Sequence, residues 1–273
     1  MMKVNAEKCI GCGQCIKDCF PRDIEMVDGK AIIKNEACFK CGHCIAVCPK
    51  EAVSTDEYNM EEVKNYQKEE FEIEPERLLN FIKFRRTVRQ FRNKEVEVEK
   101  LSKIIEAGRF TQTGTNSQDL SYVVVRDGLQ QLKNVTFETL KFMSDNILNN
   151  LTEENMSYKR YAEMWAYMYG RYKENPKEND SLFFNAPAVI VVTANSEVNG
   201  ALAASNMELM TNAVGLGTFF SGFFVAAAKG NKQIVDMLGV KPGKQIVACM
   251  VIGYPAVKYS RTVPRKSADV SWK

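Results

Sequence analysis

The chain contains 273 residues, of which 45% are hydrophobic and 26% charged, and its formal net charge is +3. This composition is typical of a globular protein, and so small a net charge, spread along the chain, argues against a nucleic-acid partner. The longest apolar runs, APAVIVVTA and IVACMVIGY, have about half the length of a membrane span, so we expect no insertion into a membrane.

The first residues, MMKVNAEKC, lack the apolar core of a signal peptide. We therefore expect a cytoplasmic protein, whose thiols stay reduced and whose clustered cysteines bind metal rather than form disulfides. Of the nine cysteines, all but Cys249 precede residue 49, and this asymmetry indicates a domain boundary. We predict a first domain over residues 1–56, a charged linker over 57–76 and a second domain over 77–273.

The early cysteines form two runs with the same C-x2-C-x2-C-x3-C spacing. This is the spacing of bacterial ferredoxins, in which the fourth cysteine of each run ligates the cluster of the other run. The glycines inside the runs let the backbone turn closely around such a cluster. We therefore predict two 4Fe-4S clusters, one held by Cys9, Cys12, Cys15 and Cys48, the other by Cys38, Cys41, Cys44 and Cys19.

Zinc is the alternative metal, but zinc usually takes two cysteine pairs separated by a longer loop. Pro49 follows the second run directly, whereas after the first run the proline comes one residue late, at Pro21. His43 is the only histidine, and we expect it to be a surface spacer. Between the runs, DIEMVDGKAIIKN predicts a β-hairpin that turns at Asp28-Gly29.

The stretch from Thr55 to Glu76 is rich in Glu and Lys, which indicates a linker or a solvated helix. Pro75 then opens a predicted helix. Its apolar face consists of Leu78, Leu79, Ile82 and Phe84.

The next stretch, FRRTVRQF, places three arginines close together. Alone, such a group most often forms a solvated face. Here it resembles the signature R-x-[ST]-x-[RK]-x-F of the nitroreductase family of flavin enzymes. The resemblance implies that FMN is held by its phosphate and ribityl chain, with the last basic residue beside the pyrimidine end of the flavin. The residues so assigned are Arg85, Arg86, Thr87 and Arg89. A guanidinium fork suits a phosphate, and a fixed cation stabilises the negative charge that reduction places on the ring.

The polar stretch TQTGTNSQ lies between a predicted helix, EKLSKIIEAGRF, and a predicted strand, LSYVVVRD. It resembles the loop of the family that meets the flavin, and Thr113 and Asn116 match that loop by residue type. The proline and tryptophan of the family are missing, replaced by Gln112 and by Asp119-Leu120. A plain polar loop therefore stays open as the alternative.

The stretch GLGTFFSGFF follows the predicted helix GALAASNMELMTNAV, and its glycine spacing does not fit the dinucleotide fingerprint G-x-G-x-x-G. It resembles the family's G-L-G-x-x-x-x-G segment, which passes the face of the flavin. The resemblance implies that Phe220, Ser221 and Gly222 are cofactor residues, with a backbone N–H near Ser221-Gly222 donating to flavin N5.

The stretch GYPAVKYSRTVPRKS resembles the terminal segment of the family, in which a basic residue returns to the FMN phosphate. Arg265 fits this role best, with Lys266 or Arg261 as alternatives. GVKPGK is too short for a phosphate loop, and Gln245 follows it where Ser or Thr is required.

The fold implied is α+β: a small ferredoxin-like domain with two clusters, then a nitroreductase-like sandwich with a mixed, mainly antiparallel sheet flanked by helices. LSYVVVRD, AVIVVTA and KQIVACMVIGY supply its strands, and Cys249 within the last is a buried core residue. Family members are homodimers with FMN at the subunit interface. The aromatic-rich segment 130–184 is either a helix pair packed on the core or a lid over the flavin.

The resemblance implies an FMN-dependent oxidoreductase that passes electrons from the clusters, from NAD(P)H, or from both, through FMN to a nitroaromatic, a quinone or an activated alkene. A ferredoxin or another redox protein is a further candidate partner. No catalytic side chain is assigned. The alternative is an electron-transfer or redox-sensing module that relays electrons to a protein partner.

Overall fold

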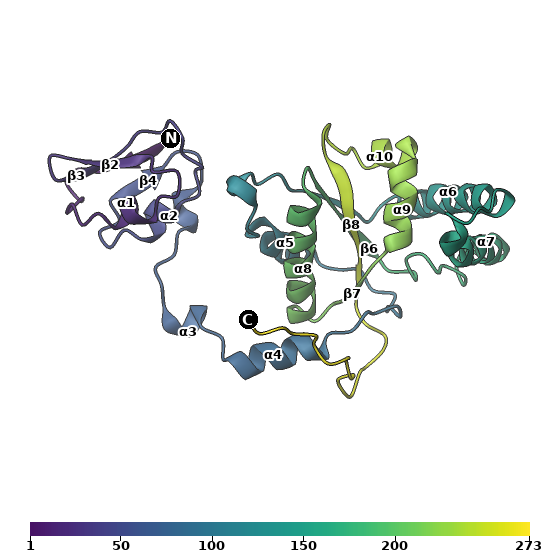
Figure 1. Cartoon of the computed structure of the whole chain (residues 1–273). Coiled ribbons are helices and arrows are strands. Elements are labelled where there is room, and N and C mark those ends of the chain that lie inside the picture. Colours follow the sequence, from purple (N-terminus) through teal and green to yellow (C-terminus); the bar gives the residue numbers. More distant parts are fainter. The chain divides into compact units, whose positions relative to one another are not determined.

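The computed structural model describes all residues, 1–273. Contacts divide the chain into two units (Figure 1): Met1–Glu74 with Thr113–Ser117, and Pro75–Gln112 with Gln118–Lys273. Residues 57–74 of the predicted linker belong to the first unit, and Pro75 and Glu76 belong to the second. The domain limits predicted from the sequence stay a prediction.

The first unit consists of short elements around the cysteine runs. In chain order they are β1 (Met2–Val4), α1 (Gln14–Asp18), β2 (Ile24–Val27), β3 (Lys30–Ile33), α2 (His43–Ala46), β4 (Val53–Thr55), η1 (Met60–Glu62), α3 (Lys68–Phe71) and, from the later segment, η2 (Gly114–Asn116). β1 pairs with β4 and β2 with β3, both antiparallel. Asp28 and Gly29 between β2 and β3 have φ of 48° and 72°, as a two-residue hairpin turn requires. The predicted hairpin is confirmed.

The second unit contains a four-stranded sheet and seven α-helices. In chain order its elements are α4 (Pro75–Phe84), α5 (Val98–Arg109), β5 (Ser121–Val125), α6 (Leu129–Asn149), η3 (Met156–Tyr158), α7 (Lys159–Glu174), β6 (Ala188–Ala194), α8 (Glu197–Ala213), β7 (Gly217–Phe220), α9 (Gly222–Gly230), α10 (Lys232–Met237) and β8 (Gln245–Gly253). The sheet order is β5-β6-β8-β7, and every neighbouring pair is antiparallel.

Alternation along the central strands creates two hydrophobic cores, one on each face of the sheet. Ile190 and Val192 of β6 pack with α5 and α8, whereas Val189 and Val191 pack with α6, α7 and α9. Figure 1 shows α5 and α8 on one side of the sheet and α9, α6 and α7 on the other. The predicted α+β sandwich is confirmed, and its one parallel pairing is an isolated bridge between Thr87 and Thr218.

The three predicted strands are confirmed as β5, β6 and β8, and the predicted helix from Pro75 to Phe84 is α4. Cys249 is fully buried in β8, also as predicted. β7 was not predicted, because only four residues of the glycine-containing stretch pair with β8. No helix combines the length and the apolar character that crossing a membrane demands.

The aromatic-rich segment forms the helix pair α6 and α7. One face of α7 is buried in the core, including Trp165 and Tyr172. Tyr161 and Tyr167 of the same helix stay exposed. The Trp165 and Tyr161 rings both meet Phe223 edge-on, at centroid distances of 5.7 and 6.1 Å. The helix pair therefore packs on the core while leaving aromatic rings beside the start of α9.

Candidate functional site

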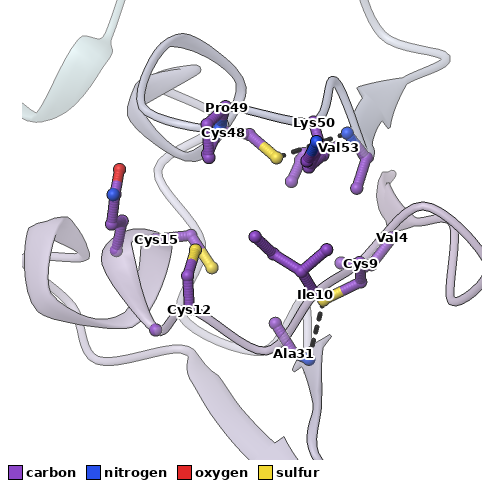
Figure 2. A pocket seen from close by; sticks show the side chains of 13 residues that line it. Val4, Cys9, Ile10, Cys12, Cys15, Ala31, Cys48, Pro49, Lys50 and Val53 are labelled. Carbon is purple, nitrogen blue, oxygen red and sulfur yellow. Dashed lines mark hydrogen bonds between the residues drawn. The ribbon is translucent and has the colours of Figure 1, made fainter.

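The first unit contains two cavities lined by cysteine. The first cavity is bordered by Cys9, Cys12, Cys15 and Cys48 (Figure 2). The second cavity is bordered by Cys19, Cys38, Cys41 and Cys44. Each cavity thus receives three cysteines from one run and the last cysteine of the other. This grouping supports the crossed assignment of the ligands, which stays a prediction.

Local backbone geometry presents these thiols. α1 and α2 each start within a cysteine run, directly after Gly13 and Gly42, whose φ of 73° and 76° lie in the left-handed region. Only glycine adopts that region without strain, so each run can turn abruptly into its helix. The two short helices therefore hold the third cysteine of each run in equivalent places.

Backbone N–H groups point at the sulfur atoms. In the first cavity Ala31 donates to Cys9 Sγ (3.5 Å) and Ala52 to Cys48 Sγ (3.3 Å). The bond from Ala31 is the main reason why the pKa of the Cys9 thiol is lowered. In the second cavity Lys40 donates its backbone N–H to Cys38 Sγ (3.4 Å). Such donors stabilise thiolate charge and the negative charge of a cluster.

The donor set fits iron–sulfur clusters. All nine cysteines are free thiols, and eight of them border the two cavities. No group of three or more His, Cys, Asp or Glu side chains lies close enough to hold a single metal ion. Four thiolates around one space are the ligands that a four-iron cluster takes. His43 borders the second cavity but is exposed.

In the second unit, the stretch Phe84–Phe91, here called the arginine segment, is fastened to the edge strand β7. Val88 donates its N–H to the carbonyl of Thr218 (3.0 Å), next to the bridge between Thr87 and Thr218. A Cβ on Gly217 would come within 2.6 Å of the Val88 side chain. Glycine at 217 therefore permits the close approach of the segment.

Two arginines of the segment have defined contacts. The guanidinium of Arg85 forms an ion pair with Glu208 of α8, and its Nε is buried with no hydrogen-bond partner. The guanidinium of Arg89 lies over the Phe219 ring, 5.6 Å from its centroid. Arg86 is half-buried and Thr87 exposed. A buried guanidinium N–H without an acceptor is an unsatisfied donor, which an anionic group would satisfy.

The residues around the start of α9 define which N–H groups remain available. Ser221 is buried and donates its N–H to the carbonyl of Cys249 (2.8 Å). Gly222 opens α9, and first-turn N–H groups have no acceptor inside their own helix. No atom lies within 4 Å of a Cβ placed on Gly222, and Phe220 is 43% exposed. The backbone at Gly222 is therefore not covered by side chains from other elements on the side where a Cβ would lie.

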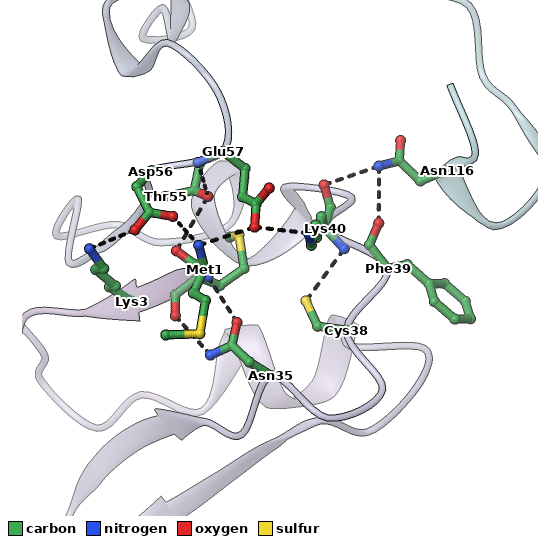
Figure 3. A network of polar contacts seen from close by, with 11 residues as sticks. Met1, Lys3, Asn35, Cys38, Phe39, Lys40, Thr55, Asp56, Glu57 and Asn116 are labelled. Carbon is green, nitrogen blue, oxygen red and sulfur yellow. Dashed lines mark hydrogen bonds and ion pairs between the residues drawn. The ribbon is translucent and has the colours of Figure 1, made fainter. Parts of the chain in front are cut away.

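The polar loop predicted to meet the flavin forms hydrogen bonds within the first unit. Thr113–Ser117 groups with the first unit, and Asn116 Nδ2 donates to the carbonyls of Phe39 and Lys40, both at 3.0 Å (Figure 3). Thr115 has a φ of 50°, which is unusual for a β-branched residue. Asn116 thus contacts the loop that carries Cys38 and Cys41. The role of Thr113 and Asn116 at the flavin stays a prediction.

Arg265 is exposed, and its guanidinium donates to the neighbouring carbonyl of Pro264 (3.4 Å). Within the same terminal segment, the Tyr259 hydroxyl donates to the carbonyl of Thr87 (3.2 Å). The terminal segment therefore reaches the arginine segment through Tyr259. The role of Arg265 stays a prediction.

Sequence reasoning missed three acidic residues. Glu208 holds Arg85. Asp119 accepts the N–H groups of Asn195 and Ser196, both at 2.9 Å, and so fixes the start of α8. Asp23 borders the second cavity. Only Asp23 could have been noticed in the sequence, because aligning the two cysteine runs pairs it with Ala52.

Residues 82–254 match the model of the Nitroreductase family, and residues 1–49 match that of the 4Fe-4S dicluster domain. A comparison with curated proteins found no match.

Solved structures similar to the chain include a nitroreductase with bound FMN from Bacteroides fragilis (17% identity, 71% of this chain and 98% of that chain, TM-score 0.53). Another is a nitroreductase with bound FMN from Desulfitobacterium hafniense (22% identity, 71% of this chain and 97% of that chain, TM-score 0.52). A third is a BluB-like flavoprotein from Clostridium difficile (18% identity, 70% and 94%, TM-score 0.51). At these identities the likeness concerns the fold.

Proposed function

Because residues 82–254 of its 273 match the family model, the chain belongs to the nitroreductase family, and we propose that it is an iron–sulfur flavoprotein oxidoreductase. In this proposal it binds FMN and two 4Fe-4S clusters. Electrons from the clusters, from NAD(P)H, or from both reach the flavin and then a small organic acceptor. The acceptor is a nitroaromatic, a quinone or an activated alkene.

One observation carries the proposal: a single chain unites two four-cysteine cavities with a nitroreductase-family unit. Clusters exchange single electrons, whereas bound FMN exchanges either one or two, so the combination suits the reduction of an organic molecule by one-electron donors. Solved structures with the fold of the second unit contain FMN.

The residues of the arginine segment supply the binding groups in this proposal. The unpaired Nε of Arg85, together with Arg86 and Thr87, would hold the phosphate and ribityl chain. Arg89 would place its fixed charge beside the flavin ring and stabilise the negative charge of the reduced cofactor. Since the N–H of Ser221 is already bonded to Cys249, Gly222 is the better donor to N5.

The nature of the acceptor is supported by the aromatic rings beside Gly222. Phe223 follows Gly222 directly, and Tyr161 and Trp165 meet it edge-on. A wall of aromatic edges favours flat, unsaturated molecules, which stack on or pack against such rings. This supports nitroaromatics and quinones over aliphatic acceptors.

An exposed aromatic residue supports the proposal that the electron donor is a protein. In the alternative relay function, the same residue would receive the protein that accepts the electrons. Phe20 follows Cys19, is 87% exposed and lies against Phe39, with ring centroids 6.1 Å apart. Exposed aromatic rings are enriched where proteins bind one another. A ferredoxin or another redox protein that docks here would exchange electrons with the cluster held in the second cavity.

A homodimer is part of the proposal. Four apolar residues of α4 are exposed, namely Leu78, Leu79, Ile82 and Phe84. A row of uncovered apolar side chains on one helix is typical of a surface that another chain covers. We propose that a second copy of this chain covers α4 and contributes to each flavin site.

The first test is an absorption spectrum of protein purified without oxygen, with iron, sulfide and FMN analysis. The expected result is eight irons, eight sulfides and one FMN per chain, which is about what two cubane clusters and one flavin require. The second test is steady-state reduction of a nitroaromatic with either NAD(P)H or a reduced ferredoxin as donor. We expect turnover with at least one of them.

A variant without clusters, Cys9→Ser with Cys19→Ser, separates the two routes. It should keep any turnover driven by NAD(P)H and lose the turnover driven by ferredoxin. If no small acceptor oxidises the reduced flavin faster than buffer does, the enzyme proposal fails and the relay function replaces it. Protein without sulfide and FMN would contradict both.

A further inference from the structure

The two cysteine runs and the residues that follow them form an internal repeat. After the last cysteine of each run the sequence reads CFPRDI in one copy and CPKEAV in the other. Arg22 and Glu51 occupy the same place, because both have left-handed φ, 55° and 49°, and both donate their N–H to that last cysteine's carbonyl. Asp23 in the first copy is therefore equivalent to Ala52 in the second.

Asp23 is a buried acidic residue beside the second cavity. It is 2% exposed and borders the cavity with Cys19, Cys38, Cys41 and Cys44. Its Oδ1 accepts the N–H groups of Glu36 (3.2 Å) and Ala37 (3.0 Å). Its Oδ2 is buried and has no hydrogen-bond partner. Burying a carboxylate oxygen without a hydrogen-bond partner costs free energy of folding. A role in function would explain why an acidic residue stands at this position.

The first cavity has the opposite electrostatic character. No acidic residue lines it, and Lys50 does. The ammonium of Lys30 donates to the carbonyl of Cys9 (2.6 Å). At the position equivalent to Asp23, Ala52 donates its N–H to Cys48 Sγ (3.3 Å). Besides Asp23 and the cysteines, His43 is the one ionisable side chain that lines the second cavity, and it is exposed. Lys40 lies outside this lining: its backbone N–H donates to Cys38 Sγ (3.4 Å), while its ammonium pairs with Glu57 (2.8 Å).

We propose that Asp23 makes the two clusters unequal electron carriers. Reduction adds one electron and no compensating charge to a cluster, so a fixed carboxylate opposes it, while an ammonium and N–H donors favour it. The cluster of Cys38, Cys41, Cys44 and Cys19 therefore has the lower reduction potential. The cluster beside Lys30 is reduced first. This inference rests on the proposed binding of two clusters.

The test is an anaerobic redox titration of the complete, cluster-loaded protein with dithionite and mediators, followed by electron paramagnetic resonance. The wild type should show two separate one-electron reductions of its clusters. Asp23→Asn should raise the lower potential and leave the higher one in place, so that the two reductions move together. Asparagine keeps an oxygen for the N–H groups of Glu36 and Ala37, and iron and sulfide analysis verifies that the clusters are present.

Two further variants keep the test decisive. Lys30→Met should lower the higher potential and leave the lower one in place. This variant still tests whether fixed charges set the two potentials if Asp23→Asn loses its cluster. Glu25→Gln removes an exposed carboxylate from β2, the strand paired with the strand of Lys30. This control should move neither potential. Coinciding reductions in the wild type, or loaded Asp23→Asn and Lys30→Met variants with unshifted potentials, would overturn the inference. Wild-type protein without clusters would instead overturn the proposed function.

Discussion

The guanidinium of Arg85 forms an ion pair with the carboxylate of Glu208, a residue 123 positions later in the chain. Both side chains are only partly exposed, so the pair is better shielded from solvent than an ordinary surface pair. Glu208 lies in α8, which covers one face of the sheet. The pair therefore holds the start of the arginine segment against a helix of the core.

Glu208→Gln is predicted to weaken FMN binding without contacting the cofactor. Loss of the pair removes about 1 kcal/mol of positioning, which corresponds to about a fivefold rise in the dissociation constant. Fluorescence titration of flavin-free protein with FMN measures it. The matched control is Glu197→Gln, which lies in α8 like Glu208 and loses an exposed pair with Lys229 of α9 (3.2 Å). Equal affinity of the Glu208 variant and the wild type would mean that Arg85 is positioned by other contacts.

Arg89→Ala is predicted to weaken flavin retention and to lower the flavin reduction potential. The loss of a charged hydrogen-bond donor costs about 1.5–3 kcal/mol, or about a tenfold or greater rise in the dissociation constant. The potential falls because the negative charge of reduced FMN loses a fixed cation. Spectroelectrochemical titration measures the second effect. Arg126→Ala, which removes an ion pair with Glu95 (3.0 Å), is the control. A fully occupied variant with an unchanged potential would contradict the role of Arg89.

Pairs of cysteine substitutions test the crossed ligand sets. Because Cys9 and Cys48 border the same cavity, Cys9→Ser with Cys48→Ser should leave about half of the iron and sulfide. Cys9→Ser with Cys19→Ser changes one ligand of each cavity and should leave almost none. Iron and sulfide analysis distinguishes the two outcomes, and the reverse pattern would show that each run holds its own cluster.

Cys249→Ala is the control for these substitutions. Burial strongly raises the pKa of the Cys249 thiol, so the residue stays protonated and is a poor ligand. The variant should retain all iron and sulfide. A loss of iron in this variant would contradict its role as a core residue.

Lys133→Met is predicted to destabilise the second unit. Asp180 is buried, and besides Lys133 Nζ (3.0 Å) it accepts N–H groups of Leu182, Phe183 and Asn185. Removal of the ammonium leaves a buried carboxylate without its counter-ion, which lowers the free energy of unfolding by about 3 kcal/mol. Urea unfolding followed by circular dichroism measures the change.

The control for this substitution lies in the same helix. Lys141 pairs with Asp145 at 2.5 Å on the surface of α6, and such pairs are worth about 0.3–0.5 kcal/mol. Lys141→Met should therefore change the free energy of unfolding by no more than that. Equal effects of the two substitutions would mean that the buried carboxylate is compensated by its backbone donors alone.

Much of the architecture was predictable because it depends on local patterns. β6 and β8 are long apolar runs, and the hairpin turn at Asp28-Gly29 has a local signature. The grouping of the cysteines was predicted from their spacing together with its likeness to that of bacterial ferredoxins, and the assignment of cluster ligands stays a prediction. β7 escaped prediction because its pairing with β8, rather than its own residues, makes it a strand.

The candidate site was predictable in residue type more than in contacts. Nothing along α8 distinguishes Glu208 from an ordinary helical glutamate, since its partner is remote in the chain. Asn116 matched a family loop by type, yet it bonds to Phe39 and Lys40. Long-range partners of this kind depend on tertiary structure and leave no local trace.

The matching left-handed residues Arg22 and Glu51 have an evolutionary consequence. Equivalent turns after equivalent cysteines are expected if the two cysteine runs derive from the duplication of one segment that held a single run. Two copies of one segment need not keep the same residue at every position, and Asp23 and Ala52 occupy one such position with different charge.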